Sequence, residues 1–206
     1  MKFSRNSIKI DPVSESEKIF KKLKDDVFNK LKKRGAVVGI SGGIDSSVVL
    51  ALCAKTFGHD KVLGVMMPES DSNPDSLILA RRLASKFNVE YVVEDMTATL
   101  AGFGCYRRRD EAIKRVFPEF DSTYKAKITL PRNLLEKETL NVFQLTIISP
   151  EGEQKTSRLP LKEYLQIVAA SNFKQRSRMS MLYYHAESKN YAVIGTGNKN
   201  EHEQGF

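Results

Sequence analysis

Cysteine is scarce in this 206-residue chain, which contains only Cys53 and Cys105. The two lie far apart in the sequence and form no CxxC pair, which argues against a disulfide scaffold and against a zinc site. Such cysteine usage is typical of a reducing compartment, and we therefore expect a cytoplasmic protein.

Long hydrophobic runs are also missing. No apolar run approaches the roughly 20 residues that a membrane-spanning helix needs, so we expect no membrane partner. Residues 1–11 lack the apolar segment of a signal peptide, and we expect no leader sequence. The apolar content of 41% and the charged content of 28% are those of an ordinary globular protein, and the length suffices for one substantial domain with its own core.

The chain carries a formal net charge of +8. A basic protein can bind nucleic acid or phosphorylated small molecules, but a solvated surface is the simpler interpretation for most of these charges. The densest basic clusters are residues 30–34, 107–109 and 174–178, and only the last lies beside other candidate site residues. We therefore expect a phosphorylated small molecule, and not a nucleic acid, as the partner.

Short apolar runs alternate with helical patterns along much of the chain. A first helix is predicted to begin at the capping box formed by Ser14 and Glu17. Strands are then predicted at 36–40, 62–67, 89–93 and 191–195, with helices at 46–55 and, capped by Asn73 or Asp75, through residue 87. This alternation predicts an α/β fold with a doubly wound parallel sheet and helices on both of its faces.

The stretch 100–160 interrupts this alternation. Residues 99–133 show no clear period, whereas 139–149 and 154–159 read as two strands of a β-hairpin joined by a turn at 150–152. Pro160 suits the first turn of a following helix, and a separate helix is predicted at 178–187. We interpret 1–206 as a single domain in which 100–160 is an insertion.

The loop "GISGGIDSS", residues 39–47, joins a predicted buried strand to a helix. Gly42 and Gly43 permit unusual backbone angles and close approach of a ligand, and the helix start offers N–H groups to an anion. The loop lacks the lysine of a Walker loop and carries Asp45 instead, which suits a Mg²⁺ ion between the carboxylate and phosphates. The simpler alternative is a tight turn with a helix cap.

"SGGIDSS" after a strand resembles the pyrophosphate loop of the N-type ATP pyrophosphatases, which cleave ATP between its α- and β-phosphates. "NFKQRSRM" at 172–179 and "GTGNKNEHEQGF" at 195–206 resemble the NAD synthetase family, with Gln175 where alanine is usual. The resemblance covers about 15–98 and 165–206. It implies a Rossmann-like sheet of the adenine nucleotide alpha hydrolase type and a homodimer.

The resemblance also implies roles for individual residues. Asp45 and Ser46 would be catalytic, and Asp45 with Glu201 would bind Mg²⁺. Asn172 and Arg176 would bind deamido-NAD. The residues implied in ATP binding are Gly39, Ile40, Ser41, Gly42, Gly43, Ile44, Asp45, Ser46 and Thr196.

The implied reaction is the ATP-dependent amidation of deamido-NAD to NAD through an adenylate. Ammonia is the expected nitrogen donor, because a glutamine-hydrolysing domain would need a nucleophilic cysteine and many more residues. The family pattern continues past Phe206, so we expect the domain to be incomplete at its C-terminal end. His59, His185 and His202 show no ligand spacing and are expected to be surface or hydrogen-bonded histidines.

Two other functions stay open at the level of sequence. A tRNA-modifying ATP pyrophosphatase would fit the basic charge, although the paired cysteines of its thiolating members are missing. A catalytically silent nucleotide-binding module would fit the hairpin and the interrupted family pattern. Met66, Met67 and Pro68, which end the second strand, could support an adenine ring or simply pack in the core.

Overall fold

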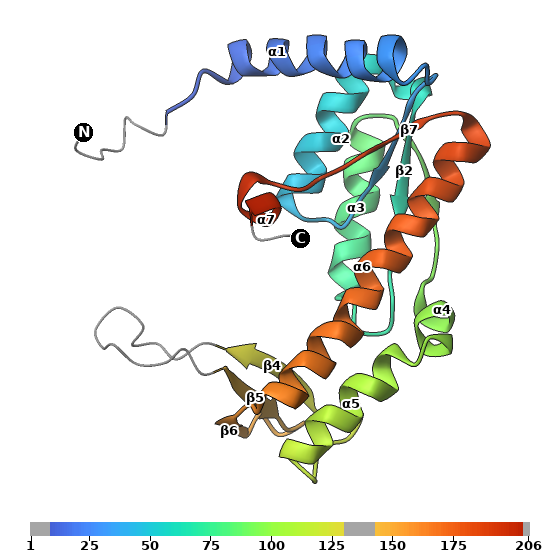
Figure 1. Ribbon diagram of the computed structural model, residues 1–206. Helices are drawn as coiled ribbons and strands as arrows, with labels where there is room; N and C mark the ends of the chain where they lie inside the picture. The colour runs from blue at the N-terminus through green and yellow to red at the C-terminus, as the bar shows by residue number, and fades with distance from the viewer. Residues whose placement is uncertain (1–8, 130–142, 204–206) are drawn as a thin grey trace. The chain divides into compact units, whose positions relative to one another are not determined.

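The computed structural model describes residues 9–129 and 143–203 (Figure 1). The chain forms two compact units, one made of Met1–Met96 with Arg178–Phe206 and the other of Thr97–Ser177. The second unit contains the whole of the stretch 100–160 interpreted as an insertion. The single-domain interpretation stays a prediction.

A four-stranded parallel sheet forms the centre of the first unit. Its strands are β1 (Ala36–Gly39), β2 (Val62–Met66), β3 (Glu90–Val93) and β7 (Ala192–Ile194), in the order β3-β2-β1-β7. Val38 of β1 pairs with Gly64 of β2 and with Ile194 of β7. The parallel α/β sheet predicted from the sequence is thus confirmed, with each strand slightly shorter than expected.

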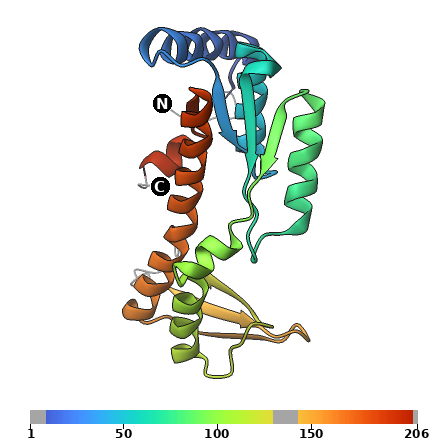
Figure 2. The same ribbon diagram turned by 90° about the vertical axis from the view of Figure 1, so that its right-hand side faces the viewer.

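Both faces of this sheet are covered because side chains alternate along each strand. On one face, Val38 packs with Leu50 and Cys53 of α2 (Ile44–Phe57) and with residues of α3 (Pro74–Lys86). On the other face, Val37 packs with Leu182 of α6 (Leu161–Lys189). Figure 2 shows the sheet between α6 on one side and α3 on the other.

The first helix begins earlier than the capping-box pattern predicts. Helix α1 spans Pro12–Lys24, and its cap is Asp11, whose side chain accepts a hydrogen bond from the Val13 N–H at 3.1 Å. The predicted cap at Ser14 is wrong because Pro12, which lacks an N–H and has a fixed φ, already takes the first helical position. A π-helical turn, η2 (Asp25–Lys30), continues α1, and the short 3-10 turn η3 (His59–Lys61) precedes β2.

The second unit is an antiparallel sheet with helices. Its strands are β4 (Lys125–Thr129), β5 (Gln144–Ile148) and β6 (Gln154–Arg158), in the order β4-β5-β6. The predicted hairpin is confirmed as β5 and β6, although the part of its first strand at 139–142 lies outside the described residues. Strand β4 and the helices α4 (Thr97–Gly102) and α5 (Cys105–Val116) were not predicted.

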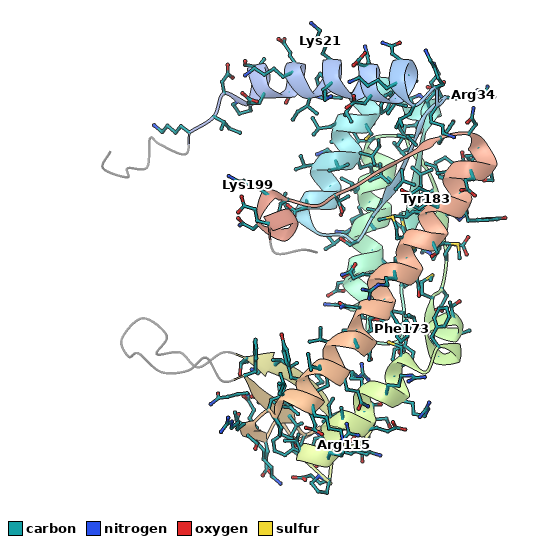
Figure 3. The ribbon with its side chains drawn as sticks, in the orientation of Figure 1. Lys21, Arg34, Arg115, Phe173, Tyr183 and Lys199 are labelled. Carbon is teal, nitrogen blue, oxygen red and sulfur yellow. The ribbon has the colours of Figure 1, made fainter. Side chains whose placement is uncertain are left out.

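Helix α6 is one continuous helix of 29 residues, and the expectation of two separate helices is wrong. Neither glycine nor proline occurs within Leu161–Lys189, so nothing in the backbone stops the helix at its polar middle. Arg115 of α5, labelled in Figure 3, donates hydrogen bonds to Glu163 Oε1 at 2.9 Å and to Gln166 Oε1 at 2.6 Å. These bonds tie α5 to the first turns of α6.

The described part of the chain contains no helix that is both long enough and apolar enough to cross a bilayer.

Candidate functional site

The candidate site lies at the carboxyl edge of the parallel sheet, next to β1. From β1 the chain winds through α2 to β2 and through α3 to β3, whereas β7 pairs on the opposite side of β1. The order of the strands therefore reverses between β1 and β7. In open α/β sheets, ligands bind outside the carboxyl ends of the strands at such a reversal.

The β1–α2 loop, residues 40–43, follows β1 at this edge. Gly42 has a φ of +80°, a conformation that residues with side chains rarely adopt. A Cβ atom on Gly42 would also lie 2.6 Å from the Ser76 carbonyl oxygen, in the first turn of α3. The loop is thus packed directly against α3, and glycine is required at this position for two independent reasons.

Helix α2 begins immediately after the loop with no side-chain cap. Gly43 stands at the cap position and leaves the first N–H groups of this 14-residue helix without a side-chain acceptor. These N–H groups and the positive end of the helix dipole favour an anion at this point. The local geometry therefore agrees with the phosphate-binding role inferred from the loop sequence.

Three serines fix the shape of the loop. The Ser46 hydroxyl, which is buried, donates to the Gly43 carbonyl at 3.1 Å and accepts from the Ser41 N–H at 3.3 Å. The Ser41 hydroxyl lies 3.1 Å from the Ser46 hydroxyl and accepts from the Gly43 N–H at 3.2 Å. Ser47 donates to the same Gly43 carbonyl at 2.7 Å. Ser46 thus holds the loop from inside, and Ser41 is the exposed hydroxyl.

Asp45 occupies the first turn of α2 and is exposed. Its carboxylate makes no hydrogen bond or ion pair with any other residue that the structure describes. Among the described residues no three His, Cys, Asp or Glu side chains gather in one place, so this part of the chain would offer a cation at Asp45 one or two carboxylates. That donor set suits Mg²⁺, which commonly takes its remaining ligands from phosphates and water.

Thr196 lies two residues after β7, the strand that pairs with β1, and is half-buried. The structure therefore brings Thr196 to the same sheet edge as the β1–α2 loop. Glu201 belongs to the short helix α7 (Lys199–Glu203), but its side chain lies outside the described residues.

Asn172 and Arg176 belong to the second unit, where they lie one turn apart on α6. Arg176 is exposed and Asn172 is half-buried. Their spacing of four residues places both side chains on one side of the helix.

Several polar contacts at the strand ends were not predicted. Arg178 Nε donates to the Met67 carbonyl at 3.2 Å, and its guanidinium lies 4.0 Å from the Glu69 carboxylate. The sequence signal for Arg178 was the basic cluster at 174–178, whereas Glu69 carried no signal beyond its place after a strand. Met66 is buried in the core and Met67 packs against the cluster beneath α6, so both methionines contribute to packing.

His185 also lies at the carboxyl edge. It is only 9% exposed, and its Nε2 atom lies 2.8 Å from Glu94 Oε1, just after β3. The expectation of a hydrogen-bonded histidine is confirmed for this residue.

The NAD synthase family model matches residues 15–128 and 109–206. The chain is 47% identical over 197 residues to the NH(3)-dependent NAD(+) synthetase of Mesorhizobium japonicum, an alignment that covers 96% of this chain and 61% of that protein. It is 45% identical over 204 residues to the enzyme of the same name from Rhizobium meliloti, with 99% and 60% covered. Alignments of this length include the second unit as well as the first.

Comparison with solved structures also finds NAD synthetases. The NH3-dependent NAD synthetase from Campylobacter jejuni, in complex with the nitrate ion, has a TM-score of 0.61 at 28% identity and covers 96% of this chain and 61% of its own. NMN synthetase from Francisella tularensis shares the fold, with a TM-score of 0.59 at 22% identity. The chain spans about three fifths of the length of the relatives it matches. On these sequence and structural matches, the chain belongs to the NAD synthase family.

Proposed function

We propose that the protein amidates deamido-NAD to NAD, using ATP and ammonia and releasing AMP and pyrophosphate. The observation that carries the proposal is the β1–α2 loop, where a Gly-rich turn, an uncapped helix start and an exposed carboxylate meet at the point where the strand order reverses. The relatives named NH(3)-dependent NAD(+) synthetase supply the substrate class.

In this proposal the loop binds ATP through its phosphates. Residues 39–46 surround the phosphates, with backbone N–H groups at the start of α2 as donors, and Thr196 adds a hydroxyl from the neighbouring strand end. Ser46 supports the site by fixing the loop, and Ser41 has the hydroxyl exposed to a ligand. Arg176 and Asn172 bind deamido-NAD, because a guanidinium matches the geometry of its pyrophosphate and an amide can both donate and accept.

Asp45 and Glu201 are the residues that would hold Mg²⁺. When bound, the ion neutralises charge on the phosphates of ATP and on the departing pyrophosphate. Asp45 would otherwise repel those phosphates. A carboxylate in a phosphate loop that has no ion-pair partner among the described residues is therefore best explained as a cation ligand.

The reaction needs no covalent nucleophile from the protein. The carboxylate of deamido-NAD attacks the α-phosphorus of ATP, and the bond to the pyrophosphate breaks. Ammonia then attacks the carbonyl of the resulting adenylate, and AMP leaves as NAD forms. The contribution of the protein is to align the two substrates and to stabilise the negative charge that develops on the pyrophosphate.

The proposal also covers the oligomeric state, the cellular location and the nitrogen donor. A homodimer and a cytoplasmic location are supported by the resemblance and by the cysteine usage. Free ammonia as the donor is supported by the names of the relatives.

The variant Asp45→Asn tests the role of the loop. We expect AMP formation to fall at least about 100-fold, because the cation that stabilises the leaving group would lose a ligand. Asp75→Asn is the matched control, since Asp75 is an exposed carboxylate in the first turn of the neighbouring helix α3. Thermal unfolding should be unchanged in both variants. Wild-type AMP formation by a folded Asp45→Asn protein would contradict the proposed role.

A further inference from the structure

We propose that Arg178 is a positioning residue of the nucleotide site, which acts on the β2–α3 loop (residues 67–73) without touching ATP itself. The proposal rests on the function proposed above, because it takes the β1–α2 loop to be the ATP site. All residues that it involves belong to the first unit. It gives a role to the one arginine of the 174–178 cluster that no step of the proposed reaction uses.

The end of β2 shows why an arginine is needed there. The Met66 and Pro68 carbonyls accept hydrogen bonds from the N–H groups of Glu94 and Met96, which follow β3, both at 2.8 Å. Carbonyls alternate in direction along a strand, so the Met67 carbonyl faces the opposite side, toward β1.

On the β1 side, the last backbone bond to β2 runs from the Ile40 N–H to the Val65 carbonyl at 2.8 Å. The next acceptor on this side would be the Met67 carbonyl, but β1 has ended and the chain turns away into the Gly-rich loop. Arg178 Nε donates to this carbonyl at 3.2 Å. The side chain of Arg178 therefore replaces the backbone donor that the sheet loses when it opens to form the site.

Glu69 extends this contact into the loop. Its side chain is only 5% exposed, and its Oε1 atom lies 4.0 Å from the Arg178 guanidinium. Its other oxygen accepts from the Asp71 N–H at 3.0 Å. A buried carboxylate is costly unless charges and hydrogen bonds compensate it, so the nearby guanidinium helps to keep Glu69 in this position.

Glu69 in turn shapes the turn that leads into α3. Its backbone N–H donates to the Ser72 hydroxyl at 3.0 Å, and its carbonyl accepts from the Ser72 N–H at 2.8 Å. Asn73 follows directly and caps α3, accepting from the Asp75 N–H at 2.9 Å. The position of Glu69 thus determines where α3 begins.

The start of α3 is also one wall of the phosphate loop. A single added carbon on Gly42 would meet the Ser76 carbonyl at 2.6 Å, so the two segments have no free space between them. If the β2–α3 loop moves, the wall against Gly42 moves as well. Arg178 therefore affects ATP binding through Met67 and Glu69, and from there through the first turn of α3.

The test compares Arg178→Met, which keeps the apolar stem but removes every donor, with Arg178→Lys and with the control Arg82→Met. Arg82 is an exposed arginine on the outer side of α3. The affinities of each purified protein for ATP with Mg²⁺ and for deamido-NAD are measured by calorimetry, below the temperature at which any variant unfolds. This readout needs no turnover.

We expect Arg178→Met to weaken ATP binding about tenfold, the loss expected for a hydrogen bond from a charged donor, and to change deamido-NAD binding less than twofold. Arg178→Lys should recover part of the ATP affinity, and Arg82→Met should match the wild type. If Arg178→Met does not fold, Glu69→Gln replaces it, because glutamine can still accept from Asp71 but carries no charge; the same selective loss is expected.

Unchanged ATP affinity, or equal losses for both ligands, would overturn the positioning role. A wild-type protein that binds ATP but forms no NAD would refute the proposed reaction while the affinity comparison still decides the role of Arg178. A wild-type protein that does not bind ATP would overturn both.

Discussion

Gly42 and Gly43 are adjacent, but the structure requires glycine more strictly at position 42 than at position 43. Gly42 combines a positive φ with a backbone oxygen where a Cβ would lie. Gly43 has an ordinary extended conformation, with a φ of −81°, and a Cβ there would meet only the Ser41 hydroxyl, at 3.3 Å. A serine hydroxyl can rotate, whereas the Ser76 carbonyl is fixed within a helix.

This difference predicts unequal effects of alanine in the loop. Gly42→Ala should lower the free energy of unfolding by about 1–3 kcal/mol, the usual cost of backbone strain, and should also weaken ATP binding because the loop must shift. Gly43→Ala should cost no more than about 1 kcal/mol, since alanine is merely a poorer helix cap. Urea unfolding of both variants measures the difference, and equal losses would show that the close contact with Ser76 does not constrain the loop.

The two cysteine thiols have a packing role in the core and no chemical role. Cys53 and Cys105 are both free and buried. Burial raises the pKa of the Cys53 thiol to about 12, so it stays protonated and unreactive at neutral pH. Cys105 donates to the Ala170 carbonyl at 3.1 Å. Both cysteines therefore act as small core residues, in agreement with a reaction that requires no thiol nucleophile.

At the scale of whole elements, the contact of α5 with α6 depends on ionisation. The hydrogen bond from Arg115 holds the pKa of the Glu163 carboxyl below its ordinary value of 4.5. A carboxyl whose pKa is lowered in the folded state stabilises the fold fully above its unfolded pKa. That contribution is lost as the pH falls through the lower, folded pKa.

Acidification should therefore lower the free energy of unfolding of the wild type more than that of a variant that lacks the Arg115 donor. In Arg115→Met the free energy of unfolding should be lower at pH 7 and should decrease less between pH 5 and pH 3. Arg108→Met is a control on the same face of α5, because Arg108 contacts α6 through its backbone carbonyl, which accepts from Gln166 Nε2 at 2.6 Å. It should keep the wild-type pH dependence. Urea unfolding across this pH range measures both. The hydrogen bond would have no stabilising role if Arg115→Met and the wild type lost the same free energy on acidification.

The elements that the sequence predicted well are those with strong local patterns. The strands β1 and β2 are continuous apolar runs with β-branched residues, and the loop between β1 and α2 has a distinctive glycine and serine pattern. Helix α5 was not predicted because its 12 residues include many charged ones and show no clear apolar stripe. Only Cys105, Ala112 and Ile113 are buried. Strand β4 is mostly exposed and obtains its backbone partners from β5, which is distant in sequence.

The candidate site likewise contains residues that the sequence could predict and residues that it could not. Its loop residues, Gly42 to Ser46, could be predicted because they follow one another in the chain and form one local structure. The contact between Arg178 and Met67 joins residues 111 positions apart, and it exists because β1 ends where β2 still needs a donor. Such a requirement arises only in the assembled sheet, so the sequence could indicate a basic cluster but not its partner.

At the scale of the whole molecule, the proposed function is a single reaction, which the family assignment and the described geometry support. The chain spans about three fifths of the length of the relatives it matches, so the measurement should use the protein at its natural length. The measurement must follow both the fate of ATP and the origin of the new nitrogen atom. It must also distinguish amidation from simple nucleotide binding.

The most direct test is to incubate the protein with ATP, Mg²⁺, deamido-NAD and ¹⁵N-labelled ammonium, and to analyse the products by mass spectrometry. The proposed function predicts equal amounts of AMP and NAD, with one ¹⁵N atom in each NAD and pyrophosphate as the other product of ATP. ADP with phosphate in place of AMP, or ATP binding without labelled NAD, would contradict it.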